Sequence, residues 1–207
     1  MSLNASLMVA NESTYGTAVT VTRAFPLISE SIKEDVVKLE AEGRRAGTVV
    51  LAKEQSLPIF QGAAGDVEIP VMSKDFGFWL QHMFGSVATS GPSDSAYTHT
   101  GSTATTKGKS FTAQINRPFH DSGTDQPFTY EGGKLTGWEF SIKAGEEPKL
   151  TLSMDFEDVK TDTALATPSY TSGLEMFSWA HASTTFTVAG TAVPITEFSL
   201  KCDLGVK

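Results

Sequence analysis

Apolar and polar residues alternate over long stretches of the second half of the chain, and this alternation limits the fold more than any other feature. In residues 150–156 every second residue is apolar, and residues 138–142 repeat the pattern. A period of two places alternate side chains on opposite faces of a β-strand. Residues 145–148 contain Gly and Pro and form a turn signal between the two stretches. Residues 138–156 are therefore predicted to form a β-hairpin with one covered face.

Further strand patterns lie on either side of this hairpin. Residues 111–115 alternate, and residues 198–204 do so after a turn signal at residues 190–191. With 207 residues, 40% of them hydrophobic and 13 of them Phe, the chain can bury a sizeable core. We predict a mainly β protein built from antiparallel strands. The chain ends at Lys207 within the last pattern, so this strand either pairs with a neighbour or continues in a longer polypeptide.

Residues 73–86 have the period of an α-helix instead. Their apolar residues recur at intervals of three and four, which gives one wide apolar face predicted to pack on the core. The residues of this face are Phe76, Trp79, Leu80, Met83 and Phe84. Ser73 is the expected N-cap, Asp75 suits the first turn, and Gly85 is expected to end the helix.

Three segments of the first half have weaker patterns. Residues 1–22 are small and polar, and we expect an extended arm that is either frayed or ordered only by a partner. In residues 31–42, Ser31 and Glu34 resemble a capping box and slightly favour a helix, although alternation there also fits a strand. Residues 87–109 are rich in Ser, Thr and Gly and are predicted to be a linker or long loop.

Residues 44–72 are predicted to form a long hairpin. Residues 48–51 and 67–71 have strand patterns, and residues 55–65 between them contain Pro and small residues typical of a mobile loop. This loop carries an apolar island of Leu57, Ile59 and Phe60. Apolar side chains on a loop indicate a partner surface, unless the loop folds back and buries them in its own domain.

The charge balance and the motifs argue against several classes of function. A net charge of −8 does not suit a nucleic-acid binder, which needs clustered Lys and Arg, but an acidic surface would let DNA slide past. The four His match no ligand spacing, and no nucleotide-binding or nucleophile motif occurs. Glu139 and Glu197 are better explained as exposed residues than as a catalytic pair. We predict no enzyme activity, no cofactor and no metal.

The expected location follows from two further absences. The N-terminus lacks the basic and apolar regions of a secretion signal, and no stretch approaches the ~20 apolar residues of a membrane span. Cys202 is the only cysteine, so a disulfide within one chain is impossible, and it is expected to be a small core residue. We expect a soluble product of the cytoplasm.

Several stretches occur in an order that resembles one protein family. They read FPLISESI at 25–32, LEAEGRRAG at 39–47, GDVEI at 65–69, FGFWL at 76–80, MFGS at 83–86, PFTYEGGKLTGW at 127–138 and GEEPKLTL at 145–152. This ordered set resembles the tail tube (major tail) proteins of siphophages, particularly those that infect actinobacteria. The resemblance covers roughly residue 16 to the C-terminus.

The resemblance implies two packed antiparallel sheets, a sandwich or barrel, with one flanking α-helix. It also implies hexameric rings that stack into a tube around a continuous inner β-barrel. Residues 44–72 would then supply lumen strands and a loop that reaches the adjacent ring. The residues assigned to this hairpin are Arg44, Arg45, Leu57, Ile59, Phe60, Asp66 and Glu68. The resemblance implies extended chain at 31–42 in place of the helix. Longer relatives leave the completeness of the C-terminus open.

On this resemblance the partners are other copies of the chain and the tape-measure, tail terminator and tail-tip proteins. DNA would pass through the lumen without specific binding and no membrane would be involved, in a virion tail assembled in the host cytoplasm. One alternative is a β-sandwich binding module for carbohydrate or adhesion, favoured if Trp138 or Trp179 lay on an exposed platform. Trp138 alternates with Phe140 and Ile142, which places it in the core instead. Another alternative is the tube protein of a contractile secretion system.

Overall fold

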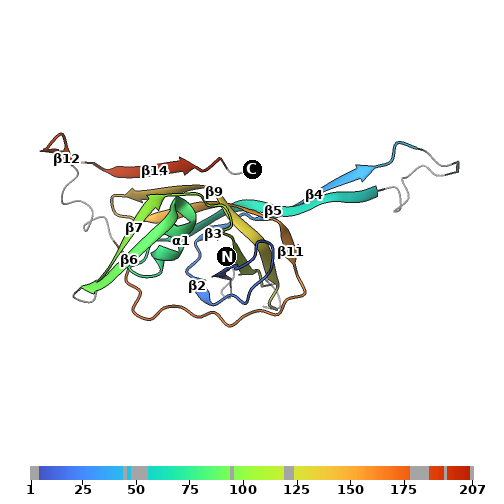
Figure 1. The fold of residues 1–207 in the computed structure, drawn as a ribbon, viewed down its shortest axis with the longest axis horizontal. Helices are drawn as coiled ribbons and strands as arrows, with labels where there is room; N and C mark the ends of the chain where they lie inside the picture. The colour runs from blue at the N-terminus through green and yellow to red at the C-terminus, as the bar shows by residue number, and fades with distance from the viewer. Residues whose placement is uncertain are drawn as a thin grey trace.

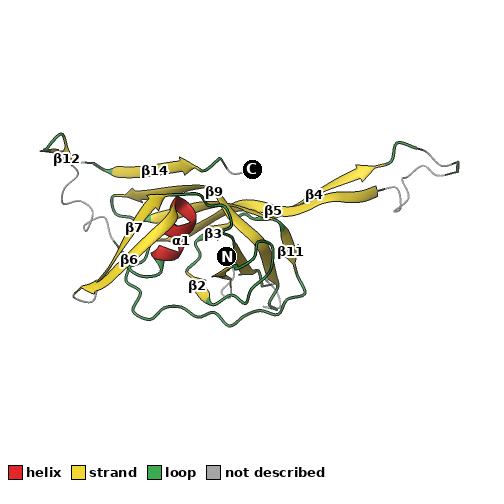
Figure 2. Cartoon of the chain, in the orientation of Figure 1, coloured by secondary structure: helices red, strands yellow, loops and turns green. Residues whose placement is uncertain are grey.

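The computed structural model describes residues 5–43, 46–47, 56–93, 96–118, 124–177, 187–193 and 195–205. The strands are β1 (Ser6–Asn11), β2 (Arg23–Phe25), β3 (Ser29–Glu30), β4 (Lys33–Glu40), β5 (Ser56–Pro70), β6 (Gly85–Ser93), β7 (Ala96–Thr103), β8 (Phe111–Asn116), β9 (Pro127–Lys143), β10 (Lys149–Phe156), β11 (Asp158–Lys160), β12 (Thr187–Val188), β13 (Thr191–Ala192) and β14 (Glu197–Asp203), and the helix is α1 (Phe76–Phe84). Figures 1 and 2 show a mainly β molecule with one flanking helix, which confirms the predicted fold class.

Two packed layers share the long strand β9 (Figure 1). In the first layer, the beginning of β9 pairs with β8 and β11, and β8 is followed by β1 and β2. In the second layer, the end of β9 pairs with β10 and β14, and β10 is followed by β5, which pairs with β3 and β4. β9 passes from one layer to the other near Gly132, whose φ of 66° is accessible to glycine at little cost. A Cβ there would lie 2.8 Å from the Cβ of Glu157.

The main core lies between the two layers and beneath α1. Trp79 of the helix is fully buried, with its ring centroid 5.2 Å from that of Phe25 and 4.9 Å from that of Phe78. All five positions of the expected helix face pack on this core: Trp79 and Met83 are buried, and Phe76, Leu80 and Phe84 are partly buried against it. Packing therefore holds a helix of only 9 residues that contains a glycine. Trp138 and Cys202 also contact this core.

The N-terminal strand corrects the expectation that residues 1–22 form an arm. β1 pairs with β2 on one side and β8 on the other, and Leu7, Met8 and Val9 are buried. Met8 faces away from the main core and packs with Leu165, in a segment that crosses the outer face of the first layer. A strand buried on both faces loses its alternation, and its few apolar residues are inconspicuous among polar neighbours.

A two-stranded ribbon of β4 and β5 extends beyond the second layer (Figure 1). β4 shows that residues 33–40 are extended, as the resemblance implied, and the local preference for a helix is wrong. β5 begins at Ser56, so the mobile loop predicted at residues 55–65 is also wrong. The strand predicted at residues 48–51 lies outside the described residues. The hairpin is thus longer than expected, because its first strand begins before residue 44.

The hairpin β6–β7 corrects the linker predicted at residues 87–109. It follows α1 directly at Gly85, whose φ of 82° ends the helix as predicted, and it lies beside the helix (Figure 2). Its side chains are mostly small and exposed, so the sequence carries little apolar alternation. Ser73 does not cap the helix: its Oγ accepts a hydrogen bond from the Glu175 amide at 3.0 Å. Asp75 occupies the N-cap position without a side-chain capping bond.

Candidate assembly surfaces

The ribbon carries exposed apolar side chains. Val37, Leu39, Leu57 and Ile59, hereafter the ribbon patch, are 45%, 59%, 62% and 58% exposed. Leu39 lies directly opposite Leu57 in the ladder, and Ile59 is the extra residue where the register shifts. The strand pairing therefore collects apolar side chains that a monomer leaves in water, at an unfavourable cost of about 25 cal/mol per Å² of apolar surface. The side chain of Phe60, and residues Arg44 and Arg45, lie outside the description.

The sequence identified only half of this patch. The sequence pattern predicts Leu57 and Ile59 as an apolar island on a loop, whereas Val37 and Leu39 lie in a segment whose pattern fits both a helix and a strand. Only the pairing of β4 with β5 brings the two halves together. The alternation that the sequence shows within residues 31–42 is the available signal, because only extended chain there can bring Leu39 opposite Leu57.

Asp66 and Glu68 lie on the face of the second layer that points away from the core. Val67 between them and Ile69 after them are buried, as strand alternation requires. Ser153 Oγ donates to Asp66 Oδ1 at 2.7 Å, and Ser29 Oγ donates to a Glu68 carboxylate oxygen at 3.0 Å. Hydroxyls of neighbouring strands therefore hold both carboxylates in place.

This outward surface continues across the whole second layer, and we call it the polar face. One row of directly opposed residues crosses five strands: Lys201, Glu139, Thr151, Glu68 and Ser29. Lys201 Nζ lies 3.9 Å from Glu139 Oε2, and Lys149 Nζ lies 3.7 Å from Glu68 Oε1. Lysines thus stand among the carboxylates, and the surface is mixed in charge rather than uniformly acidic.

The strands at the sides of the second layer have open edges. Among the described residues, β14 pairs with β9 alone, and β4 pairs with β5 alone. β14 holds the alternation predicted for residues 198–204, with Leu200 exposed and Cys202 half-buried. Open edges are positions where a strand of another molecule can continue a sheet.

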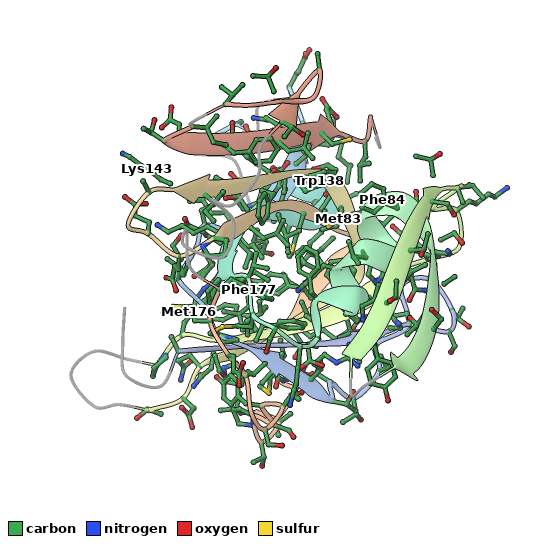
Figure 3. The ribbon with its side chains drawn as sticks, turned by 90° about the vertical axis from the view of Figure 1, so that its left-hand side faces the viewer. Met83, Phe84, Trp138, Lys143, Met176 and Phe177 are labelled. Atoms are coloured by element: carbon green, nitrogen blue, oxygen red, sulfur yellow. The ribbon has the colours of Figure 1, made fainter. Side chains whose placement is uncertain are left out.

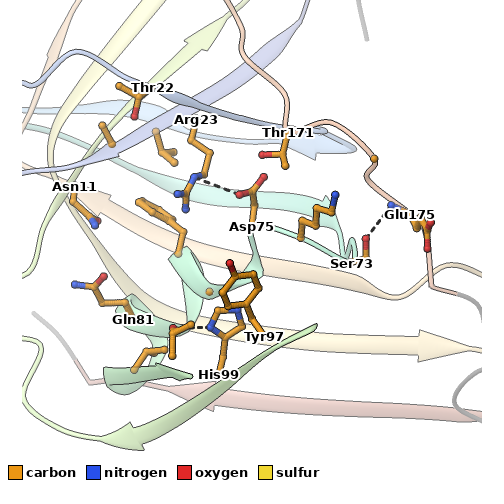
Figure 4. A pocket seen from close by; sticks show the side chains of 18 residues that line it. Asn11, Thr22, Arg23, Ser73, Asp75, Gln81, Tyr97, His99, Thr171 and Glu175 are labelled. Atoms are coloured by element: carbon orange, nitrogen blue, oxygen red, sulfur yellow. Dashed lines mark hydrogen bonds and ion pairs between the residues drawn. The ribbon is translucent and has the colours of Figure 1, made fainter. Parts of the chain in front are cut away.

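A cleft of about 1180 Å³ lies between β1, β2, α1, β7 and residues 171–175 (Figure 4). Arg23 Nε lies 3.6 Å from Asp75 Oδ1, which joins β2 to the start of the helix. On the opposite wall, His99 Nδ1 lies 2.8 Å from Thr89 Oγ1, and Tyr97 is exposed. Lys74 Nζ, also in the lining, donates to the Ser172 carbonyl at 2.8 Å. Within the described part of the chain, no group of three His, Cys, Asp or Glu side chains could hold a metal ion.

His82 of α1 is buried between aromatic rings. Its Nε2 lies 2.9 Å from Asn11 Oδ1, and its ring centroid is 5.0 Å from that of Phe78 and 4.9 Å from that of Phe111. Burial, with a smaller contribution from Lys109, lowers the pKa of His82 to about 4. It is therefore a neutral histidine that donates to Asn11 and joins the helix to the end of β1.

Among the described residues, the fold forms neither the tryptophan platform of a binding module nor the carboxylate pair of an enzyme. Trp138 is buried, 5.8 Å from the ring of Phe84, and forms no surface platform. Trp179 lies outside the described residues. Glu139 stands opposite Lys201 in the ladder, and Glu197 stands opposite Lys143, so the two carboxylates do not form a pair.

The chain matches a known protein family over nearly its whole length. A model of the phage tail tube protein family matches residues 2–207. The chain belongs to the phage tail tube protein family. This confirms the resemblance to phage tail tube proteins that the sequence indicated. Members of the family are structural proteins of the virion tail that assemble into its tube, and the family is not a class of enzyme. No curated protein sequence matches the chain significantly.

The surfaces described above are therefore those of a tail tube protein. None of the helical segments that the structure describes is long and apolar enough to span a membrane. The ribbon patch, the polar face and the open edges lie on the second layer, whereas the first layer is covered on both sides.

Proposed function

We propose that this tail tube protein forms hexameric rings, that the rings stack into the tail tube, and that DNA passes through the lumen to the host. The observation that supports this most strongly is the β4–β5 ribbon, which continues the second layer beyond the body and carries exposed apolar side chains. A ribbon of this kind is costly to a monomer and useful in a stack. The hexamer follows from the resemblance to siphophage proteins.

The two edges of the second layer suit ring closure. Rotation about one axis brings the β14 edge of one copy toward the β3–β4 edge of the next, and a repeated contact of this kind closes into a ring. The second layers would then form one barrel without edges. We place the polar face toward the lumen, because the opposite face of the sheet is occupied by the core.

The chemistry of the polar face suits a passive conduit. DNA is bound by clustered Lys and Arg, whereas here the Lys side chains lie among carboxylates and hydroxyls. The face therefore neither captures phosphates nor repels them strongly. We propose no catalytic role. Contacts with tape-measure, tail terminator and tail-tip proteins, and assembly in the host cytoplasm, belong to the same proposal.

Negative-stain electron microscopy of the purified protein tests this function. We expect rings with sixfold symmetry in end views, and tubes as concentration rises. A sedimentation profile that stays monomeric at millimolar concentration would contradict the proposal. A ring of another order would correct the stoichiometry and retain the tube.

A further inference from the structure

A second apolar group lies at the other end of the molecule from the ribbon patch. Met176 and Phe177, hereafter the end patch, are adjacent in sequence and are 58% and 42% exposed. Figure 3 looks at the end of the molecule opposite the ribbon, and both side chains lie at the front of this view. Met176 is fixed there because its backbone forms a β-bridge with Met72.

A single strand connects the two patches. β5 begins at the ribbon patch with Ser56 and ends at Pro70, and Met72 follows two residues later. A strand of 15 residues spans about 50 Å at ~3.3 Å per residue. The ribbon patch and the end patch therefore lie at opposite ends of β5, and both remain outside the core.

Two different surfaces at opposite ends of one molecule form a head-to-tail contact, and its repetition by translation gives an open stack. We propose that Met176 and Phe177 accept the ribbon patch of a second copy in the adjacent ring. This inference rests on the stacking proposed above and names the surface that receives the ribbon. One such contact would bury both patches, because each patch covers the apolar surface of the other.

The polar cleft beside α1 is a poorer receiver for the ribbon. Insertion of Leu57 or Leu39 there would remove the ion pair between Arg23 and Asp75 from water and offer it no new partner. The end patch contains no charge of its own. The apolar ribbon therefore fits the end patch better than the larger cleft.

Matched double variants test the contact in the full-length chain. We expect Met176→Ser with Phe177→Ser to form rings but at least tenfold fewer tubes, counted by electron microscopy. Leu57→Ser with Ile59→Ser should have the same effect. Tyr97→Ser, which removes another exposed aromatic ring, is the control and should form normal tubes. Circular dichroism establishes that each variant is folded, as expected for side chains outside the core.

Mixing the two double variants gives a sharper result. Each retains one intact surface, so a mixture should form pairs of rings and no long tubes. Normal tubes from the end-patch variant alone would overturn this inference and leave the proposed function intact. If the unaltered protein forms no tubes, the proposed function itself fails.

A crosslink locates the contact. In a Cys202→Ser background, Ile59→Cys in one copy and Phe177→Cys in another should yield a disulfide-linked dimer upon oxidation of assembled tubes. The same pair should remain monomeric when the ribbon carries Leu57→Ser and rings do not stack. Assembled tubes that show no crosslink would place the acceptor elsewhere and overturn the inference.

Discussion

The first layer and the ribbon differ in which side chains they bury. In the first layer even polar residues are buried: β8 is buried along its whole length, and Gln114 donates from Nε2 to Thr129 Oγ1 and to the Ala164 carbonyl, each at 3.0 Å. In the ribbon even apolar residues are exposed, as Leu39 and Leu57 show. The side chains of the first layer are covered within one chain, whereas on the proposed function those of the ribbon are covered by another molecule. Stability and assembly are therefore expected to respond to different substitutions.

The largest expected loss of stability comes from Glu12, at the end of β1. Its buried carboxylate accepts hydrogen bonds from Ser110 Oγ at 2.6 Å, Thr112 Oγ1 at 2.9 Å, and the Gly132 and Gly16 amides at 2.9 and 3.1 Å. Glu12→Ala leaves four donors without this acceptor and should lower the free energy of unfolding by about 3 kcal/mol or more. Urea denaturation measures this loss.

The matched control is Glu40→Ala at the end of β4. Glu40 is exposed on the ribbon, and its removal should change the free energy of unfolding by less than about 0.5 kcal/mol. Equal losses from the two variants would show that the first layer does not depend on this buried carboxylate, and the contrast between the two regions would fail.

His82 gives the first layer a dependence on pH. Its pKa is about 4 in the folded chain against an ordinary 6.5, so between these values the unfolded chain binds a proton that the folded chain does not. This contribution is constant above pH 6.5, decreases as the pH falls toward 4, and levels off below. At 1.36 kcal/mol per pKa unit, the loss amounts to about 3 kcal/mol at most.

His82→Gln tests this account because glutamine can still donate to Asn11 but does not titrate. The variant's stability curve should be flatter than that of the unaltered chain between pH 6.5 and 4, as measured by thermal unfolding. His99→Gln removes an exposed histidine from β7 and should leave the curve unchanged. A curve for His82→Gln as steep as that of the unaltered chain would assign the pH dependence to carboxylates elsewhere.

Arg117 joins the first layer to β3 and to the residue before the ribbon, and its substitution should have an intermediate effect. It follows β8 of the first layer and donates to both carboxylate oxygens of Glu30 in β3, at 2.8 and 2.6 Å, and to the Ile32 carbonyl at 2.9 Å. Its guanidinium lies 4.7 Å from the ring centroid of Phe128. Arg117→Lys keeps the charge but loses the paired geometry, and should cost about 1–2 kcal/mol in urea denaturation.

The difference in burial between these regions also explains which strands could be predicted from the sequence. β10 and the end of β9 were predicted because one face is core and the other is polar, so their residues alternate. β1 is buried on both faces and shows no such period, and β6–β7 has few large side chains to show one. The hydrogen bond between Glu12 and Ser110 joins residues 98 positions apart in the sequence, so no local sequence pattern can predict it. Of the ribbon patch, the sequence predicted Leu57 and Ile59 as exposed. It could not predict that Leu39 lies opposite Leu57, because that register is set by the pairing of β4 with β5.

The smallest expected loss of stability belongs to the ribbon, and it is the most informative about assembly. Leu57→Ser should change the free energy of unfolding by less than about 0.5 kcal/mol, because the side chain stays mostly exposed when the monomer folds. Leu152→Ser makes the same change in the core of the second layer, where the side chain is fully buried, and should cost about 3 kcal/mol or more. Sedimentation should rank the variants differently, with tubes lost in Leu57→Ser while the monomer stays folded. If Leu57→Ser unfolds as readily as Leu152→Ser, the ribbon belongs to the folding unit, and its exposure does not indicate a missing partner.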